Sequence, residues 1–311
     1  MNRYQRGLLL LIVVGLAALS GASCPPRWFE QFQPQPPPRV LSTAPTLEEV
    51  IQVVNRNNSQ IHSVLSTNAA LSGTGFPTLR ANLALQRPKR FRLRGDLLAS
   101  AELDLGSNDE LFWAWVKRAQ PAAMLYCRHD QFAASRLRQM TPLEPEWFIE
   151  ALGIAEFDPG LPHQEPRRLP GDKLEIRTIR ETPQGPMMKV TVLDAAQAWI
   201  LEQRLYDSQG RLVASSTTSR HRRDPATGLV MPTLVSINFP PAKVELRLDL
   251  GNVQINRLAG NPSEIWSMPN YQGYPVVDLG APNFQWPPAS APAAGHASIL
   301  RPALEVGRPG N

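Results

Sequence analysis

Alternation of apolar and polar residues with a period of two runs through most of the chain between residues 83 and 248, and this is the period of half-buried β-strands. It is clear, for example, over residues 111–116 and 235–239. Turn-forming segments such as 207–210 and 224–228 separate the runs. The pattern predicts an antiparallel meander of about ten strands, and a sheet of that length must curl or close.

Two helices are expected beside these strands. Thr46 and Glu49 have the spacing of a capping box, and the apolar residues that follow recur at helical spacing, which predicts an amphipathic helix over 46–58. A second helix is predicted over 143–152, where Gly153 can end it.

The N-terminus has the layout of an export signal. Basic residues precede an apolar run over 7–19, which is too short for a comfortable transmembrane span, and small residues then lead to Cys24. The segment resembles a lipobox, although Gly21 stands where Leu is usual. We predict a lipoprotein signal peptide over 1–23 and a diacylglycerol anchor on Cys24. Ordinary secretion with cleavage near Ser23 and an uncleaved membrane anchor are the alternatives.

Proline-rich segments flank the patterned region. The chain has 31 prolines, concentrated near both ends. Residues 24–45 are rich in Pro and Gln and predict an extended tether, and residues 282–311 predict a disordered tail. A single folded domain is therefore expected over 46–281.

Few residue patterns in the sequence point to catalysis. The five histidines show no metal-ligand spacing, and we find no phosphate-binding glycine loop and no nucleophile elbow. Cys127 has no disulfide partner if Cys24 carries lipid, and its apolar surroundings predict a buried free thiol. We therefore expect a non-enzymatic protein without metal or cofactor.

Charge argues against nucleic acid as the main partner. A net charge of +5 on 311 residues is a weak surplus. Basic residues cluster over 87–94 and 220–223. They form either a solvated outer face or a contact surface for anionic lipid head groups.

The order of motifs after the first predicted helix resembles the LolA/LolB superfamily of periplasmic lipoprotein carriers and acceptors. The segment QRPKRF over 86–91 is followed by a turn over 107–110 and the Trp-rich run over 112–115. The resemblance covers about residues 46–280. It implies an α+β fold that is mainly antiparallel β: an unclosed half-barrel wrapped around a few helices, with an apolar cavity that takes acyl chains.

The resemblance also implies roles for particular residues. In the carriers, the arginine of the Arg-Pro motif bonds to a lid helix, and the matching position is Arg87, which is otherwise a surface arginine. The inward face of the sheet would line the cavity, unless its residues pack on the helices as core. The candidate lining residues are Phe91, Leu93, Leu111, Trp113, Trp115, Trp199 and Leu201.

Together these features predict a membrane-anchored envelope lipoprotein that binds lipophilic ligands or lipoprotein acyl chains. Lipid anchors occur in the acceptors and not in the soluble carriers, so Cys24 indicates the acceptor type. Pro25 stands where an Asp would signal inner-membrane retention, which favours the outer membrane, facing the periplasm. The alternative is a structural or sensory envelope module of the same fold that binds a protein partner without lipid cargo.

Overall fold

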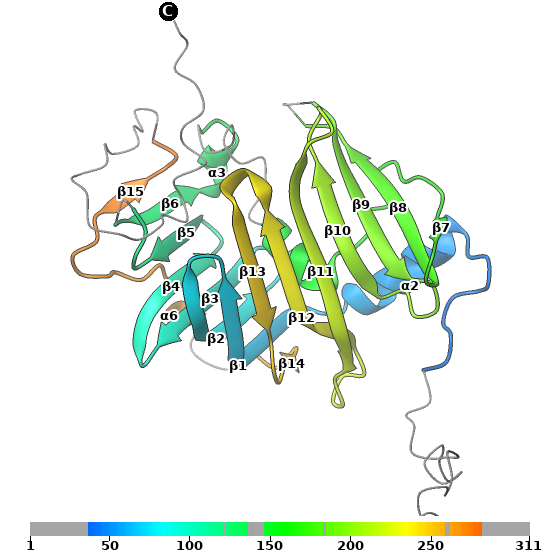
Figure 1. Ribbon diagram of the computed structural model, residues 1–311, viewed down its shortest axis with the longest axis horizontal. Coiled ribbons are helices and arrows are strands. Elements are labelled where there is room, and N and C mark those ends of the chain that lie inside the picture. Colours follow the sequence, from blue (N-terminus) through cyan, green and yellow to red (C-terminus); the bar gives the residue numbers. More distant parts are fainter. Residues whose placement is uncertain are drawn as a thin grey trace, which may run out of the picture. The chain divides into compact units, whose positions relative to one another are not determined.

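A single sheet dominates the computed structural model, which describes residues 37–120, 122–135, 138, 146–182, 185–258 and 262–281 (Figure 1). The predicted signal peptide, Cys24, most of the predicted tether and the tail lie outside these residues. The strands of the first half are β1 (Ser63–Gly73), β2 (Phe76–Gln86), β3 (Arg90–Leu97), β4 (Ser100–Ser107), β5 (Leu111–Val116) and β6 (Met124–Arg128). Those of the second half are β7 (Arg167–Leu169), β8 (Lys173–Arg180), β9 (Met187–Asp194), β10 (Ile200–Tyr206), β11 (Leu212–Arg223), β12 (Val230–Phe239) and β13 (Val244–Asp249). Two short strands follow, β14 (Gln254–Ile255) and β15 (Val276–Asp278).

Two meanders form this sheet. β1 to β6 and β7 to β13 each pair with their neighbours in sequence, and β1 joins β13 to make them continuous. β15 adds to β6 in parallel at one edge and β7 forms the other edge, with no pairing between the two. The sheet therefore curls without closing, and the predicted architecture, an unclosed and mainly antiparallel half-barrel with few helices, is confirmed.

The strand number is larger than expected. The described residues contain a 15-stranded sheet, whereas the alternation predicted about ten strands. β7, β14 and β15 have only two or three residues, too few to show a period. In β1 the pairing shifts register between Ser66 and Ala69, which interrupts the alternation.

The first predicted helix is confirmed as α2 (Leu47–Asn58). The Thr46 hydroxyl accepts a bond from the backbone N–H of Glu49 at 3.2 Å. The reciprocal half of the capping box is not formed, because the Glu49 carboxylate binds the N–H and hydroxyl of Ser42 at 2.7 and 2.8 Å. The apolar face of α2 buries Val50 and Val54 against β8 and β9.

The second predicted helix runs through the middle of the domain. Its described part is α5 (Trp147–Ile149), continued by the π-helical segment η2 (Glu150–Ile154); we call residues 147–154 the interior helix. Gly153 has φ +83° and is not helical. A Cβ at this glycine would lie 2.7 Å from Cγ of Pro232 on β12, so glycine permits the close approach of helix and sheet.

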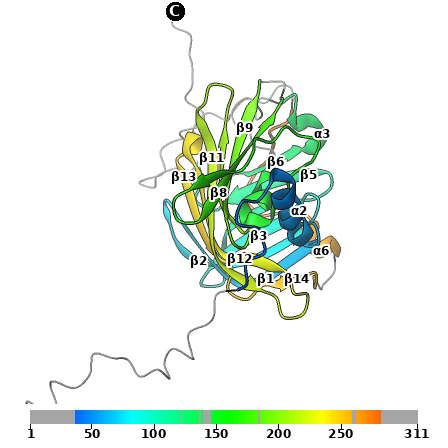
Figure 2. The ribbon, with the colours of Figure 1, turned by 90° about the vertical axis from the view of Figure 1, so that its right-hand side faces the viewer.

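Both long helical elements lie on the same side of the sheet, which we call the inner face (Figures 1 and 2). The interior helix packs there against aliphatic side chains of both meanders. The fully buried members of this core include Leu83, Leu85, Leu93, Leu152, Ile154 and Val235.

The outer face near β3 to β6 is covered by residues 262–281, which we call the C-terminal strap. It contains α6 (Pro262–Trp266) and β15. Tyr271 donates a hydrogen bond to the buried carboxylate of Asp104 at 2.9 Å, and its ring stacks on Trp115 with centroids 3.8 Å apart. Two further short helices, α3 (His129–Phe132) and η3 (Pro240–Ala242), connect elements at the sheet margin.

At the other end of the domain, the last residues of the predicted tether contact the sheet. Arg39 donates to the Ala195 carbonyl at 2.7 Å and pairs with Asp172 at 2.7 Å. Leu41 is buried in the same core as α2. Residues 39–41 thus attach to the turn between β9 and β10.

Candidate functional site

Two of the seven predicted lining residues lie on the inner face beneath the interior helix. Phe91 stacks on Phe148 with ring centroids 4.7 Å apart. Leu93 is fully buried in the core that contains Trp147 and Leu152. Side chains of the interior helix fill the space next to both residues.

Three other candidates lie on the outer face. Trp113 donates to the Asp104 carboxylate at 3.0 Å, Trp115 stacks on Tyr271, and Leu111 packs with them beneath the C-terminal strap. The sheet register explains this: Leu93 pairs with Leu105, which pairs with Ala114, so the tryptophans on either side of Ala114 point the opposite way. The seven candidates therefore do not line one cavity.

The last two candidates lie near the start of β10. The ring of Trp199 stacks on that of His221 with centroids 4.8 Å apart, and Leu201 is partly exposed. Burial lowers the pKa of His221 to about 4, so the imidazole is neutral at physiological pH.

Arg87 lies between β2 and β3 and contacts the end of the interior helix. Its guanidinium donates to the carbonyl of Ile154 and forms an ion pair with Glu156. This is the kind of contact that the resemblance implies for the arginine of the Arg-Pro motif.

Two further side chains bind the interior helix at Glu150, near its middle. The ammonium of Lys189 on β9 pairs with Glu150 at 2.6 Å. The side-chain amide of Gln203 on β10 donates to the Glu150 carbonyl at 2.7 Å. The sheet thus holds the helix by polar contacts at its C-terminal end and near its middle, while its apolar side chains pack on the core.

A pocket of about 530 Å³ opens beside the interior helix, and we call it the helix pocket. Its apolar lining residues are Trp147, Phe157, Leu161, Met187 and Leu205. Its charged and polar lining residues are Arg138, Glu146, Glu150, Glu156, Asp158, His163, Thr178, Arg180, Thr182 and Lys189. Such a mixed lining suits a ligand with an apolar chain and a polar end. Sequence reasoning missed this pocket, because its residues come from segments that only the fold brings together.

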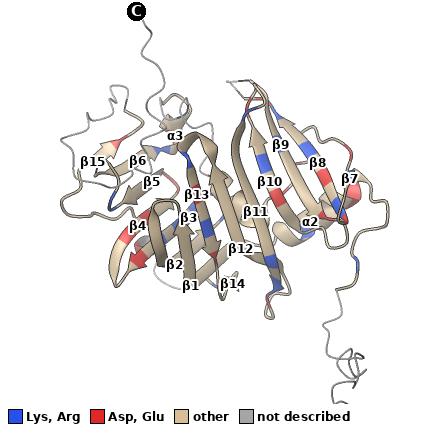
Figure 3. Cartoon of the chain, in the orientation of Figure 1, with Lys and Arg blue, Asp and Glu red and all other residues tan. Residues whose placement is uncertain are grey.

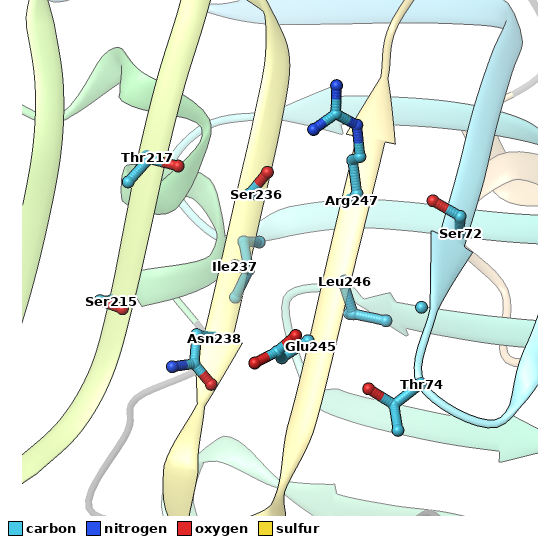
Figure 4. A pocket seen from close by; sticks show the side chains of 11 residues that line it. Ser72, Thr74, Ser215, Thr217, Ser236, Ile237, Asn238, Glu245, Leu246 and Arg247 are labelled. Atoms are coloured by element: carbon cyan, nitrogen blue, oxygen red, sulfur yellow. The ribbon is translucent and has the colours of Figure 1, made fainter.

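A second hollow, the outer groove, lies on the outer face of β11, β12, β13 and β1 and has a volume of about 560 Å³. Figure 4 shows the side chains that line it, which are mainly hydroxyls and an amide, with Glu245 and Arg247 on β13. This lining offers hydrogen bonds to a polar partner rather than a surface for an acyl chain.

Ion pairs account for most of the basic clusters. Arg90, Arg92 and Arg94 pair with Asp109, Asp104 and Asp96, respectively. Arg220 pairs with Asp249 at 2.8 Å. On β8 and β10, residues of opposite charge lie side by side (Figure 3). Paired cations have less charge to offer to lipid head groups, and Arg92 is also covered by the C-terminal strap, so residues 87–94 do not form an open basic surface.

An exposed leucine that the sequence reasoning missed stands at the tip of the β3–β4 hairpin. Leu97 pairs with Ser100, which leaves Leu98 and Ala99 as a two-residue turn with φ +47° and +67°. Such turns normally contain Asn-Gly, because a left-handed backbone costs about 1–2 kcal/mol for other residues. Leu98 is 96% exposed. The hairpin therefore presents a large apolar side chain to solvent from a strained turn.

The chemistry of the remaining reactive groups is limited. Cys127 is a buried free thiol, as predicted, and burial raises its pKa to about 11. Within the described ranges, no group of three or more His, Cys, Asp or Glu could hold a metal ion. A helix long and apolar enough to cross a membrane is likewise absent from the part of the chain that the structure describes.

Comparison with known proteins gives a likeness of fold. No family model and no curated protein matches the sequence. Among solved structures, a Vibrio parahaemolyticus domain described as an outer membrane lipoprotein-sorting protein has 10% identity and a TM-score of 0.48, over 69% of this chain and 94% of that one. A LolA superfamily protein from Nitrosomonas europaea has 12% identity and a TM-score of 0.43, over 72% and 99%. A DUF1329 family protein from Desulfovibrio piger has 14% identity and a TM-score of 0.45, over 70% and 98%. These similarities assign no ligand or partner to this chain.

Proposed function

We propose that this chain is a non-catalytic envelope lipoprotein that binds the acyl chain of a lipophilic ligand or lipoprotein between the interior helix and the inner face of the sheet. The observation that carries the proposal is the mode of attachment of that helix. Its C-terminal end is held by the side chain of Arg87, and Glu150 near its middle is held by Lys189 and Gln203. Its apolar side chains cover aliphatic residues of the sheet.

A bound acyl chain can replace the apolar surface that the interior helix buries. When the interior helix moves away, an acyl chain can cover the same aliphatic surface. Each buried methylene contributes about 0.8 kcal/mol, so about ten methylenes contribute about 8 kcal/mol before the cost of moving the helix. The helix pocket gives such a chain an entrance beside Trp147 and Glu150 of the interior helix.

We further propose that the protein acts at the outer membrane, facing the periplasm, anchored through lipid on Cys24. The exposed Leu98 supports contact with a membrane, because transfer of one leucine side chain from water to an apolar phase contributes about 1.5–3 kcal/mol. The strained turn that presents this residue has no evident benefit for folding.

Binding of a fatty acid that carries a terminal dansyl group tests the proposal. The chain is produced with Cys24→Ser, so that no lipid of its own competes for the site. Saturable binding is expected, and Leu93→Glu should abolish it because the carboxylate would lie in the apolar site. Arg94→Gln, a change at a surface ion pair, is the control and should bind normally. Failure of the unsubstituted protein to bind the probe saturably would refute the ligand-binding proposal.

The outer groove favours the second candidate, a structural or sensory module that binds a protein partner. Its polar lining fits a polypeptide better than a lipid. If the outer groove binds a protein partner, Arg247→Glu should abolish binding of that partner without changing the binding of the dansyl fatty acid. Partner binding that is unchanged in the Arg247→Glu variant would count against the second candidate.

A further inference from the structure

A row of three buried polar side chains crosses the inner face beneath the interior helix. Thr191 on β9, Gln203 on β10 and Ser216 on β11 are each 1% exposed. Gln203 pairs directly with Thr191 on one side and with Ser216 on the other, so the three side chains are neighbours on adjacent strands. Gln203 reaches the Glu150 carbonyl, which places the row beneath the interior helix.

Each member of this row carries an oxygen atom without a hydrogen-bond partner among the described residues: Oγ1 of Thr191, Oε1 of Gln203 and Oγ of Ser216. Most other buried hydroxyls in this sheet are bonded. Ser66, for example, is equally buried and donates to the Leu250 carbonyl at 2.6 Å. An unpaired buried polar group destabilises a protein, so three in one row are costly for the state with the helix docked.

The row continues the wall of the helix pocket. Lys189 and Leu205 line that pocket, and Thr191 and Gln203 lie two residues from them along the same strands, hence on the same face. A ligand that enters the pocket and displaces the interior helix would next meet the three unpaired oxygens.

The orientation of Gln203 defines the chemistry that this row can recognise. Because the Glu150 carbonyl can only accept, the atom facing it must be the amide nitrogen, which leaves Oε1 as an unpaired acceptor. The hydroxyls of Thr191 and Ser216 can donate. An amide group satisfies both needs, since its N–H donates to Gln203 and its carbonyl accepts from a hydroxyl, whereas an ester lacks the N–H.

We infer that the row Thr191, Gln203 and Ser216 is a polar subsite within the acyl-binding region, and that it selects acyl chains joined through an amide. This inference rests on the proposed function and specifies its ligand. The apolar inner face binds the chain, and the row fixes the position of the amide along it.

Competition between two matched probes tests the inference. N-ethyl dodecanamide and ethyl dodecanoate have the same length and differ in the amide and ester linkage. The amide should displace the dansyl fatty acid at about tenfold lower concentration than the ester, the ratio expected when one buried acceptor is left unpaired. Gln203→Met, which keeps the side-chain length without the acceptor, should remove the difference.

Thermal unfolding provides an independent readout. Thr191→Val removes a hydroxyl without a partner and should raise the Tm of the ligand-free protein while weakening amide binding. Ser66→Ala is the matched control: it removes a bonded hydroxyl, so it should lower the Tm and leave the preference for the amide unchanged.

The outcomes separate the inference from the function on which it rests. Saturable binding of the dansyl fatty acid with equal displacement by amide and ester would overturn the inference and leave the proposed function standing. This comparison needs only the unsubstituted protein, so it does not depend on the folding of any variant. Failure of the dansyl fatty acid and the amide to bind at all would overturn both.

Discussion

Replacing Arg87 by Met would remove both polar contacts that hold the end of the interior helix at Ile154 and leave the apolar part of the side chain in place. The arginine side chain is 20% exposed and its partner Glu156 is 37% exposed. A hydrogen bond from a charged donor contributes about 1.5–3 kcal/mol, and an ion pair at this exposure contributes about 0–1 kcal/mol. The docked helix should therefore lose about 2–3 kcal/mol.

That loss shifts the equilibrium between the docked and the undocked helix by about 30- to 150-fold, since each 1.4 kcal/mol is a factor of ten. Hydrogen–deuterium exchange measures the shift directly. The amides of residues 147–154 should exchange faster by this factor, and those of β2, in the centre of the sheet, should keep their rates. Affinity for the dansyl fatty acid should rise, because a smaller fraction of molecules holds the helix closed.

Arg94→Met provides the comparison, because it breaks an ion pair with Asp96 that does not involve the interior helix. It should leave exchange in residues 147–154 unchanged. The reasoning is refuted if Arg87→Met leaves those rates unchanged, or if exchange accelerates throughout the sheet, which would make Arg87 a support of the whole domain.

Four further changes have defined outcomes. Cys24→Ser should move the protein from the membrane to the soluble fraction on cell fractionation, and retention in the membrane would contradict lipidation. Gly153→Ala should lower the Tm, because it places a side chain on a left-handed backbone with its Cβ 2.7 Å from Pro232. The folded state should lose about 1–3 kcal/mol. An unchanged Tm would show that the interior helix can move away from β12 without loss of stability. Leu98→Asn should stabilise the strained turn by about 1 kcal/mol and reduce co-sedimentation with anionic vesicles, and undiminished co-sedimentation would exclude a membrane role for this residue. The folded-state pKa of His221 is about 4, below its ordinary value of 6.5. The stability that its neutral form contributes is therefore present above pH 6.5 and is lost as the pH falls toward 4. His221→Gln should flatten the dependence of Tm on pH between these two values.

Much of the fold could be predicted from the sequence, because strand alternation and helix capping are local patterns. The turns over 207–210 and 224–228 connect β10 to β11 and β11 to β12, as expected. The helix over 46–58 begins and ends within one residue of its predicted bounds. In each case, residues close in the chain determine the structure.

The candidate site was less predictable, because it depends on relations between strands. Alternation shows that Trp113 and Trp115 share a face, but only the register across β3, β4 and β5 shows that this face is opposite to that of Leu93. The row at Gln203 depends on the same kind of information. Its three residues lie on consecutive strands and become neighbours only through the register of β9, β10 and β11.

The pairing of β1 with β13 has a consequence for how the domain is assembled. Each meander can grow by adding hairpins between segments adjacent in the chain, which is a fast process. The pairing of β1 with β13 is different, because Ala70 pairs with Asp249 near the other end of the domain. This pairing can form only when both meanders exist. Until then β1 keeps one unpaired edge, and we expect the joining of the two halves to be the last event of folding.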